Sequence, residues 1–256
     1  MSVGKQFGLS HHAYRRFRPN YPEPIYARVL AELGSRRELA VDLGAGTGLV
    51  SAALGRHFAR VVAVEPDPGM AAHLHETAPQ AEIQSVVAEQ AELEPGSVDL
   101  VTCANAFHWM AGPQVAGAIA GWLREGGLFA GWRYPMPAMP EAVAELVRRA
   151  VLIPSAPFLD PAVLDMRGMQ RCFAERPEFE LVVDEIVANP IAMDLDALIG
   201  FLRSVSFVAA FLRSLGDDAA ERHLDELGAG LRERLGEGEL VVDFALTFMV
   251  ARRRRL

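Results

Sequence analysis

The fold class is indicated by Leu39-Ala-Val-Asp-Leu-Gly-Ala-Gly-Thr-Gly48, an apolar run that ends in three closely spaced glycines. The run predicts a buried strand, and the segment 49–58 that follows has the apolar spacing of a helix. Glycines between a strand and a helix allow a tight turn, a close approach of the backbone to a ligand, and access to the first N–H groups of the helix. The stretch therefore predicts a β–α–β unit with a ligand-binding loop.

Strands and helices alternate along the first half of the chain. The predicted strands are 39–43, 60–65, 83–88, 98–104 and 128–134, and the predicted helices are 24–33, 49–58, 68–77 and 114–123. This alternation is typical of a parallel, doubly wound α/β sheet. Beyond Pro135 the alternation stops, and the pattern predicts helices at 141–151, 195–215 and 219–235 and strands at 179–187 and 240–251.

These elements predict an α/β fold with a seven-stranded, mostly parallel sheet and a helical insertion. We expect the last strand to be antiparallel, because a helical pair and not a crossover precedes it. Residues 1–135 are expected to form a cofactor-binding core with an N-terminal lid segment. Residues 136–256 are expected to form a helical substrate cover that also supplies the last two strands, 179–187 and 240–251.

Glu65 ends the second predicted strand, about 20 residues beyond the glycine loop, where a carboxylate can accept hydrogen bonds from both hydroxyls of a ribose. The dinucleotide pattern G-x-G-x-x-G is absent, because Leu49 or Ser51 stands where its third glycine would be needed. An acid, Asp42, beside the glycine N–H groups suits a ligand with an ammonium and a carboxylate better than a pyrophosphate. The spacing therefore argues against a dinucleotide cofactor.

The stretch Val41-Asp-Leu-Gly-Ala-Gly-Thr-Gly48 resembles the first motif of class I S-adenosylmethionine-dependent methyltransferases. The resemblance implies a Rossmann-like fold and S-adenosyl-L-methionine as the cofactor. It also implies that the cofactor is held by Asp42, Gly44, Gly46, Gly48 and Glu65.

Two further segments, 65–70 and 88–92, resemble the next motifs of the same family. They imply that Pro66 and Met70 lie near the ribose and adenine, and that Glu89 and Gln90 lie at the adenine amino group. Asn105 follows the fourth strand, where the family places residues near the cofactor. The alternatives are a solvated loop acid for Glu89, a core residue for Met70 and a turn former for Asn105.

The segments 14–22, 107–109, 129–134 and 202–206 resemble the trans-aconitate methyltransferase-like branch of this family. This resemblance implies a small-molecule acceptor without naming it, because neighbours in the branch methylate different molecules. Tyr14 and Arg18 belong to the first segment and are expected to fold over the methionine end of the cofactor. The alternative is a helix that only covers the sheet.

Methyl transfer requires positioning of the acceptor and exclusion of water more than it requires catalytic side chains. His108 follows the fourth strand and is the candidate general base, or else it lines the cofactor pocket together with Trp109. Arg133 ends the fifth strand beside Tyr134, and its guanidinium suits an anionic substrate, the alternative being a surface ion pair. We expect O-methylation of a carboxylate or hydroxyl, with N-, S- or C-methylation open.

Composition limits the classes of partner. The 256 residues include 33 acids and 25 bases, for a net charge of −8, which disfavours a nucleic-acid backbone as partner. The most apolar stretch, 100–123, is interrupted by polar residues and is not expected to span a membrane. Two distant cysteines without a CxxC pattern and the absence of a signal-peptide pattern indicate a cytoplasmic protein without a metal site. We expect a monomer or homodimer. An NAD-dependent oxidoreductase and a non-catalytic cofactor-binding protein are the competing hypotheses.

Overall fold

The computed structural model describes residues 16–236 and 238–255. Backbone contacts divide the chain into two compact units whose segments alternate along the sequence. Of the described residues, the sheet unit comprises 20–134, 165–187 and 246–255, and the helical unit comprises 16–19, 135–164, 188–236 and 238–245. The predicted division was instead a single boundary, at residue 135.

The sheet unit is built on seven strands in the order β3-β2-β1-β4-β5-β9-β6. Their bounds are β1 (Leu39–Leu43), β2 (Arg60–Val64), β3 (Glu82–Gln84), β4 (Val98–Ala104), β5 (Leu123–Arg133), β6 (Phe179–Val187) and β9 (Leu246–Arg253). Strand β9 runs antiparallel to both of its neighbours, β5 and β6. The predicted fold class, a mostly parallel seven-stranded sheet with an antiparallel last strand, is confirmed.

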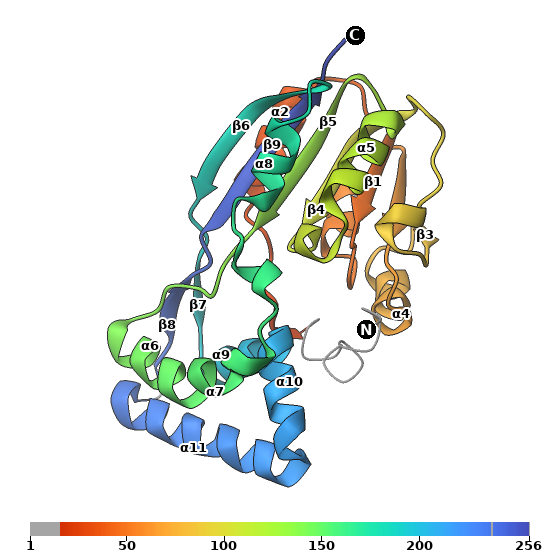
Figure 1. The fold of residues 1–256 in the computed structure, drawn as a ribbon. Coiled ribbons are helices and arrows are strands. Elements are labelled where there is room, and N and C mark those ends of the chain that lie inside the picture. Colours follow the sequence, from red (N-terminus) through yellow and green to blue (C-terminus); the bar gives the residue numbers. More distant parts are fainter. Residues whose placement is uncertain (1–15, 237, 256) are drawn as a thin grey trace. The chain divides into compact units, whose positions relative to one another are not determined.

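Helices cover both faces of this sheet (Figure 1). Helices α5 (Gly112–Trp122) and α8 (Gly168–Ala174) cover one face, where the ring of Phe173 stacks on that of Phe129 at 4.0 Å between centroids. Helices α2 (Glu23–Leu33), α3 (Leu49–Leu54) and α4 (Pro68–Thr77) cover the other face, where Tyr26 meets Trp132 edge-on. Because side chains alternate along β5, Phe129 and Trp132 point to opposite faces, as a doubly wound sheet requires.

The helical unit contains α6 (Glu141–Val147), a π turn at 148–152, α7 (Ile153–Ser155), α9 (Leu195–Ser204), α10 (Ser206–Leu215), α11 (Asp217–Leu235) and the two-stranded sheet of β7 (Pro190–Met193) and β8 (Leu240–Asp243). His223 of α11 contacts the carbonyl oxygen of Ala150 in the π turn at 2.7 Å. No single described helix has both the length and the apolar composition to cross a membrane, and α9 and α10 meet that criterion only as a pair bent by 89°.

One predicted strand and one predicted helix are each divided in two in the structure. In both, the apolar sequence pattern continues across the point where the element ends. The strand predicted at 240–251 is two strands, since the N–H of Phe244 donates to the carbonyl of Asn189 and the Phe244 ring packs on Phe201. Strand β8 consequently pairs with β7 and only β9 joins the main sheet. The helix predicted at 195–215 breaks at Val205, which has an extended conformation with φ −75° and ψ 126°.

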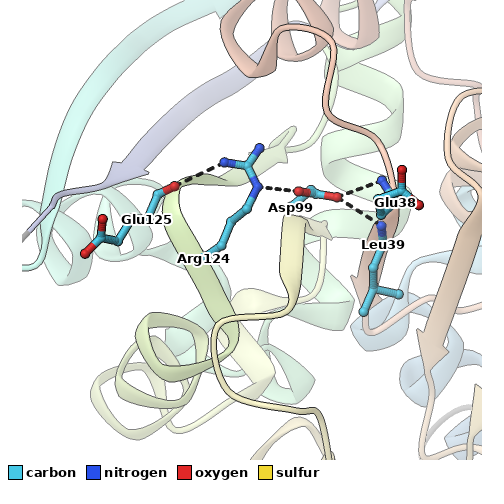
Figure 2. Close-up of polar contacts among 5 residues, drawn as sticks. All are labelled: Glu38, Leu39, Asp99, Arg124 and Glu125. Carbon is cyan, nitrogen blue, oxygen red and sulfur yellow. Dashed lines mark hydrogen bonds and ion pairs between the residues drawn. The ribbon is translucent and has the colours of Figure 1, made fainter.

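A buried acid ties three strands together at the end of the sheet where β1 begins (Figure 2). Asp99, 2% exposed, accepts hydrogen bonds from the N–H groups of Glu38 and Leu39 at 2.7 and 3.1 Å. Arg124 of β5 forms an ion pair with the same carboxylate. Burial by itself would raise the pKa of Asp99, but the guanidinium and the two N–H groups outweigh it and hold the pKa below its ordinary value.

Candidate active site

The glycine loop lies between the carboxyl ends of β1 and β2. The N–H groups of Gly44 and Ala45 both donate to the carbonyl of Val64, at 2.9 and 3.1 Å. Gly44, Gly46 and Gly48 have φ values of 64°, 57° and 90°, in the left-handed region that favours glycine. A methyl group at position 44 would also collide with Cβ of Ala106, so the loop packs closely against the turn after β4.

Glu65 holds this loop in place. Its Oε2 accepts the N–H of Gly46 at 2.8 Å and its Oε1 accepts the N–H of Asp67 at 2.9 Å. Burial raises the pKa of Glu65 above its ordinary value. The predicted ribose acid therefore lies against the loop, and half-buried Pro66 separates it from the start of α4.

Asp67 caps α4 through hydrogen bonds from the N–H groups of Gly69 and Met70. Met70 is buried in the first turn of this helix. Across the loop, Glu89 in the short helix η2 (Ala88–Gln90) accepts the N–H of Ala111 at 2.6 Å, immediately before α5, and Gln90 is exposed. The structure thus gives Glu89 a defined partner at the start of a helix, where a carboxylate is stabilised.

Asp42 is the most buried acid of the site, with 1% of its surface exposed. Its two oxygens accept the hydroxyls of Ser51 and Thr102 at 2.7 and 2.9 Å. Burial raises the pKa of Asp42 to about 6, and within the described residues no cationic side chain forms an ion pair with it. Burial, followed by the charge of Asp42, also raises the pKa of Cys103.

The turn after β4 carries Asn105 and the helical turn η3 (Phe107–Trp109). Asn105 has φ 52°, and its N–H donates to the carbonyl of Trp132 at 2.8 Å. His108 and Trp109 are half-buried, and their rings lie 4.7 Å apart. These residues stand at the carboxyl edge of the sheet, beside the glycine loop, where open α/β sheets bind ligands.

Arg133 and Tyr134 follow at the end of β5, and both are buried. Nη1 of Arg133 donates to the carbonyl of Asp165 at 3.0 Å, and burial lowers the pKa of the guanidinium. The alternative of a surface ion pair for Arg133 is wrong, because only 6% of the residue is exposed. The N–H of Tyr134 donates to Oδ1 of Asn105, which joins the ends of β4 and β5.

The N-terminal cluster is divided. Tyr14 lies outside the described residues. Arg18 is in the helical unit, where its Nη2 donates to the carbonyl of Ser204 at 3.0 Å and its guanidinium lies 5.4 Å from the centre of the Phe201 ring. Tyr21 is in the sheet unit and meets Trp132 edge-on. The lid role of this segment stays a prediction.

The hydroxyl residues Thr47, Ser51 and Thr102 were not predicted from the sequence. Ser51 and Thr102 fix the Asp42 carboxylate, and Thr47 in the loop is 2% exposed with a hydroxyl that has no partner among the described residues. Thr47 could have been predicted, because it stands between two glycines of the loop motif. Ser51 and Thr102 stand in apolar runs, and no sequence pattern indicates that they contact Asp42. The described residues contain no group of three or more His, Cys, Asp or Glu placed to bind a metal ion.

Comparisons with known proteins indicate the class of enzyme. Residues 41–131 match the family model of a methyltransferase domain. A protein of Dictyostelium discoideum that carries the name of a methyltransferase is 26% identical over 97% of this chain and 95% of its own length. An uncharacterized methyltransferase of Mycobacterium bovis is 40% identical over 121 residues, which span about half of that relative (49%) and 47% of this chain.

Among solved structures, a chain from Anaeromyxobacter dehalogenans that carries the name of a type II methyltransferase has a TM-score of 0.75 and 26% identity, over 94% of this chain and 100% of that one. The fold, the glycine loop with its acid and these relatives define a class I methyltransferase. The chain is an S-adenosylmethionine-dependent methyltransferase. The site fits a ligand with a ribose and an amino-acid tail. A side chain at position 44 would collide with Ala106, Glu65 is buried beside the loop, and Thr47 and Asn105 have buried polar atoms without a partner among the described residues.

Proposed function

We propose that this enzyme methylates an oxygen atom, of a carboxylate or a hydroxyl, on a small-molecule acceptor. The observation that carries this proposal is the burial of Arg133 at the carboxyl end of β5. A guanidinium removed from water attracts an anion more strongly than an exposed one, and its planar fork matches a carboxylate. Trp109 and Tyr134 are the aromatic side chains proposed to contact the acceptor. N-, S- or C-methylation is the alternative.

For the cofactor, we propose binding by the glycine loop with Glu65 on the ribose, Asp42 near the methionine end, and Met70, Pro66, Glu89 and Gln90 around the adenosine. Two observations support this set: Glu65 already hydrogen-bonds the loop, and Asp42 is a buried acid without a cation among the described residues. The bound cofactor supplies a methyl carbon activated by the positive charge on sulfur.

The chain's own contribution is to hold the acceptor in line and to manage its proton. A hydroxyl acceptor requires a base, and His108 accepts that proton on an imidazole nitrogen. A carboxylate acceptor is already ionised and requires no base, so that His108 then only lines the pocket. Within the class, we propose a place near the trans-aconitate methyltransferase-like branch, which the motifs at 107–109 and 129–134 support. We also propose a cytoplasmic enzyme that is a monomer or homodimer.

Calorimetry with S-adenosylhomocysteine and with NAD tests the cofactor. We expect binding of the first, which also raises the thermal midpoint, and no binding of the second. Binding of NAD alone would favour the oxidoreductase, and cofactor binding with no turnover on any acceptor would favour a non-catalytic protein. Glu65→Ala is expected to abolish binding, because it removes both the ribose acceptor and the support of the loop.

A metabolite library incubated with methyl-labelled S-adenosylmethionine, with products identified by mass spectrometry, tests the acceptor. We expect labelled esters or ethers. His108→Ala should leave cofactor affinity unchanged and lower kcat about 100-fold or more for a hydroxyl acceptor, but not for a carboxylate. Labelled amines or thiols as the main products would contradict O-methylation.

A further inference from the structure

Asn105 is held in an unusual conformation after β4. Among the described residues it is the one residue other than glycine with a positive φ, 52°. Its N–H donates to the carbonyl of Trp132, and its Oδ1 accepts the N–H of Tyr134 at 3.2 Å. Because an N–H must face an oxygen, the Tyr134 contact also fixes which way the side-chain amide is turned. The Asn105 side chain is therefore locked onto the end of β5.

One hydrogen-bonding group of this side chain is unmatched. Nδ2 of Asn105 is buried and has no acceptor in the described part of the chain. A buried donor without an acceptor is unfavourable, and so is a left-handed backbone at a residue with a side chain. Both costs fall on one residue, which is the pattern expected where the local structure serves a ligand.

The location of Asn105 indicates which ligand site this is. The next residue, Ala106, lies so close to Gly44 that a methyl group on that glycine would collide with it. Asn105 therefore stands one residue from the contact between this turn and the glycine loop, at the edge of the sheet that the proposed cofactor and acceptor share.

We propose that Nδ2 of Asn105 donates a hydrogen bond to a carboxylate oxygen of a ligand bound beside Gly44. Since Oδ1 is occupied by Tyr134, the side chain has only N–H donors to offer, and its partner must be an acceptor and not an ammonium. Two ligands can supply the carboxylate: the amino-acid tail of the cofactor and an acidic methyl acceptor. The inference rests on the proposed function.

The variant Asn105→Asp isolates the donor. Aspartate keeps an oxygen for the N–H of Tyr134 and tolerates a positive φ, but it replaces the NH₂ group by an oxygen that repels a carboxylate. Affinities for S-adenosylhomocysteine and 5′-methylthioadenosine are measured by calorimetry. The second ligand has the adenosine and the sulfur but no amino-acid tail. If the tail is the partner, affinity for the first falls about 10- to 100-fold and affinity for the second changes less than about twofold.

Two control variants accompany it. Gln80→Glu makes the same amide-to-acid change at an exposed position near Gly55 and should leave both affinities unchanged. Asn105→Gly removes the donor without adding charge and relieves the positive φ, but it also removes the acceptor for the N–H of Tyr134. If the tail is the partner, this variant should lose affinity for S-adenosylhomocysteine and keep its affinity for 5′-methylthioadenosine, a selectivity that misfolding would not produce.

If S-adenosylhomocysteine affinity is unchanged in Asn105→Asp, the second arm measures methylation of a panel of small carboxylic acids. A fall of tenfold or more in kcat/KM then assigns the carboxylate to the methyl acceptor. The proposal is overturned if both adenosine ligands bind equally more weakly to Asn105→Asp. It is also overturned if binding is unchanged and methylation of the acids is either unaffected or undetectable. A wild-type protein that binds neither adenosine ligand would contradict the proposed function itself, which is a different result.

Discussion

Two buried carboxylates stand at opposite ends of one sheet, Asp99 where β4 begins and Asp42 where β1 ends. Both are almost inaccessible, with 2% and 1% of their surface exposed. Asp99 has a guanidinium and two backbone N–H groups, and its pKa lies below the ordinary value. Asp42 has two hydroxyls and no ion-pair partner among the described residues, and burial raises its pKa to about 6. Two equally buried carboxyl groups therefore have pKa values shifted in opposite directions.

The two pKa shifts indicate that the end of the sheet at Asp99 serves stability and that the end at Asp42 serves binding. A buried charge is tolerated where a cation and hydrogen bonds compensate it, as at Asp99. At Asp42 the compensation is incomplete, and a ligand with a cationic group near the glycine loop would complete it. Cofactor binding is then expected to stabilise the ionised form of Asp42.

The largest effect is expected from Asp99→Ala. This change leaves Arg124 and the N–H groups of Glu38 and Leu39 without their shared acceptor, so the free energy of unfolding should fall by about 3–5 kcal/mol. Urea unfolding at pH 7 measures it. Asp99→Asn keeps an acceptor and should lose less. A loss below about 1 kcal/mol in the alanine variant would mean that this end of the sheet is not held by the acid.

Asp42→Asn is expected to raise the free energy of unfolding at neutral pH, whereas Asp99→Ala lowers it. The folded pKa of Asp42, about 6, lies above its unfolded value of 3.8, so the native state binds the proton more tightly. Stability contributed by this group is therefore full below pH 4 and is lost as the pH rises from about 4 to 6. The loss amounts to about 3 kcal/mol, since one pKa unit corresponds to about 1.4 kcal/mol.

The asparagine variant cannot ionise, so it should equal wild type near pH 4 and exceed it in stability above pH 6. Urea unfolding of both proteins at three pH values between 4.5 and 8 measures the difference. Asp99→Asn serves as the matched control, because the pKa of Asp99 lies below its ordinary value of 3.8 and its contribution to stability should stay constant over this pH range. If the difference in unfolding free energy between the wild type and Asp42→Asn does not change with pH, the pKa of Asp42 is not raised.

A change of pH is expected to have a smaller effect on ligand affinity than these substitutions have on stability. If the ammonium of the amino-acid tail compensates Asp42, binding of S-adenosylhomocysteine lowers the pKa of Asp42 and releases a proton below pH 6. Affinity should then rise about tenfold between pH 5 and 7, and the rise should be absent in Asp42→Asn. Calorimetry in buffers of different ionisation enthalpy detects the proton. The same pH dependence for 5′-methylthioadenosine, which has no ammonium, would exclude this coupling.

The comparison also shows what the sequence can predict. The strand–loop–helix around Gly44 to Gly48 is encoded locally, so an apolar run and a glycine spacing were sufficient to predict it. Glu65 was predicted because it ends a strand, although its bond to Gly46 was not. The Asp99 cluster was not predicted, because its partners stand about 25 and 60 residues away and no pattern links them.

The breaks at Val205 and Phe244 could not be predicted for a related reason. The apolar pattern continues through both, and the break depends on contacts with distant residues such as Asn189 and Phe201. At the site, residue types were predicted better than their partners. Arg133 was expected at the sheet edge, but its burial and its bond to Asp165 follow from the packing of the segment before α8.

The smallest effect is expected from the ion pair of Arg60 and Glu82, on neighbouring strands β2 and β3. Its Nε–Oε1 distance is a short 2.9 Å, yet 60% and 56% of the two side chains are exposed. Water already solvates both charges, so Glu82→Gln should leave the midpoint of urea unfolding unchanged within error. If this variant were as destabilising as Asp99→Ala, a guanidinium–carboxylate contact and not its burial would determine stability, and the contrast between the two ends of the sheet would lose its physical basis.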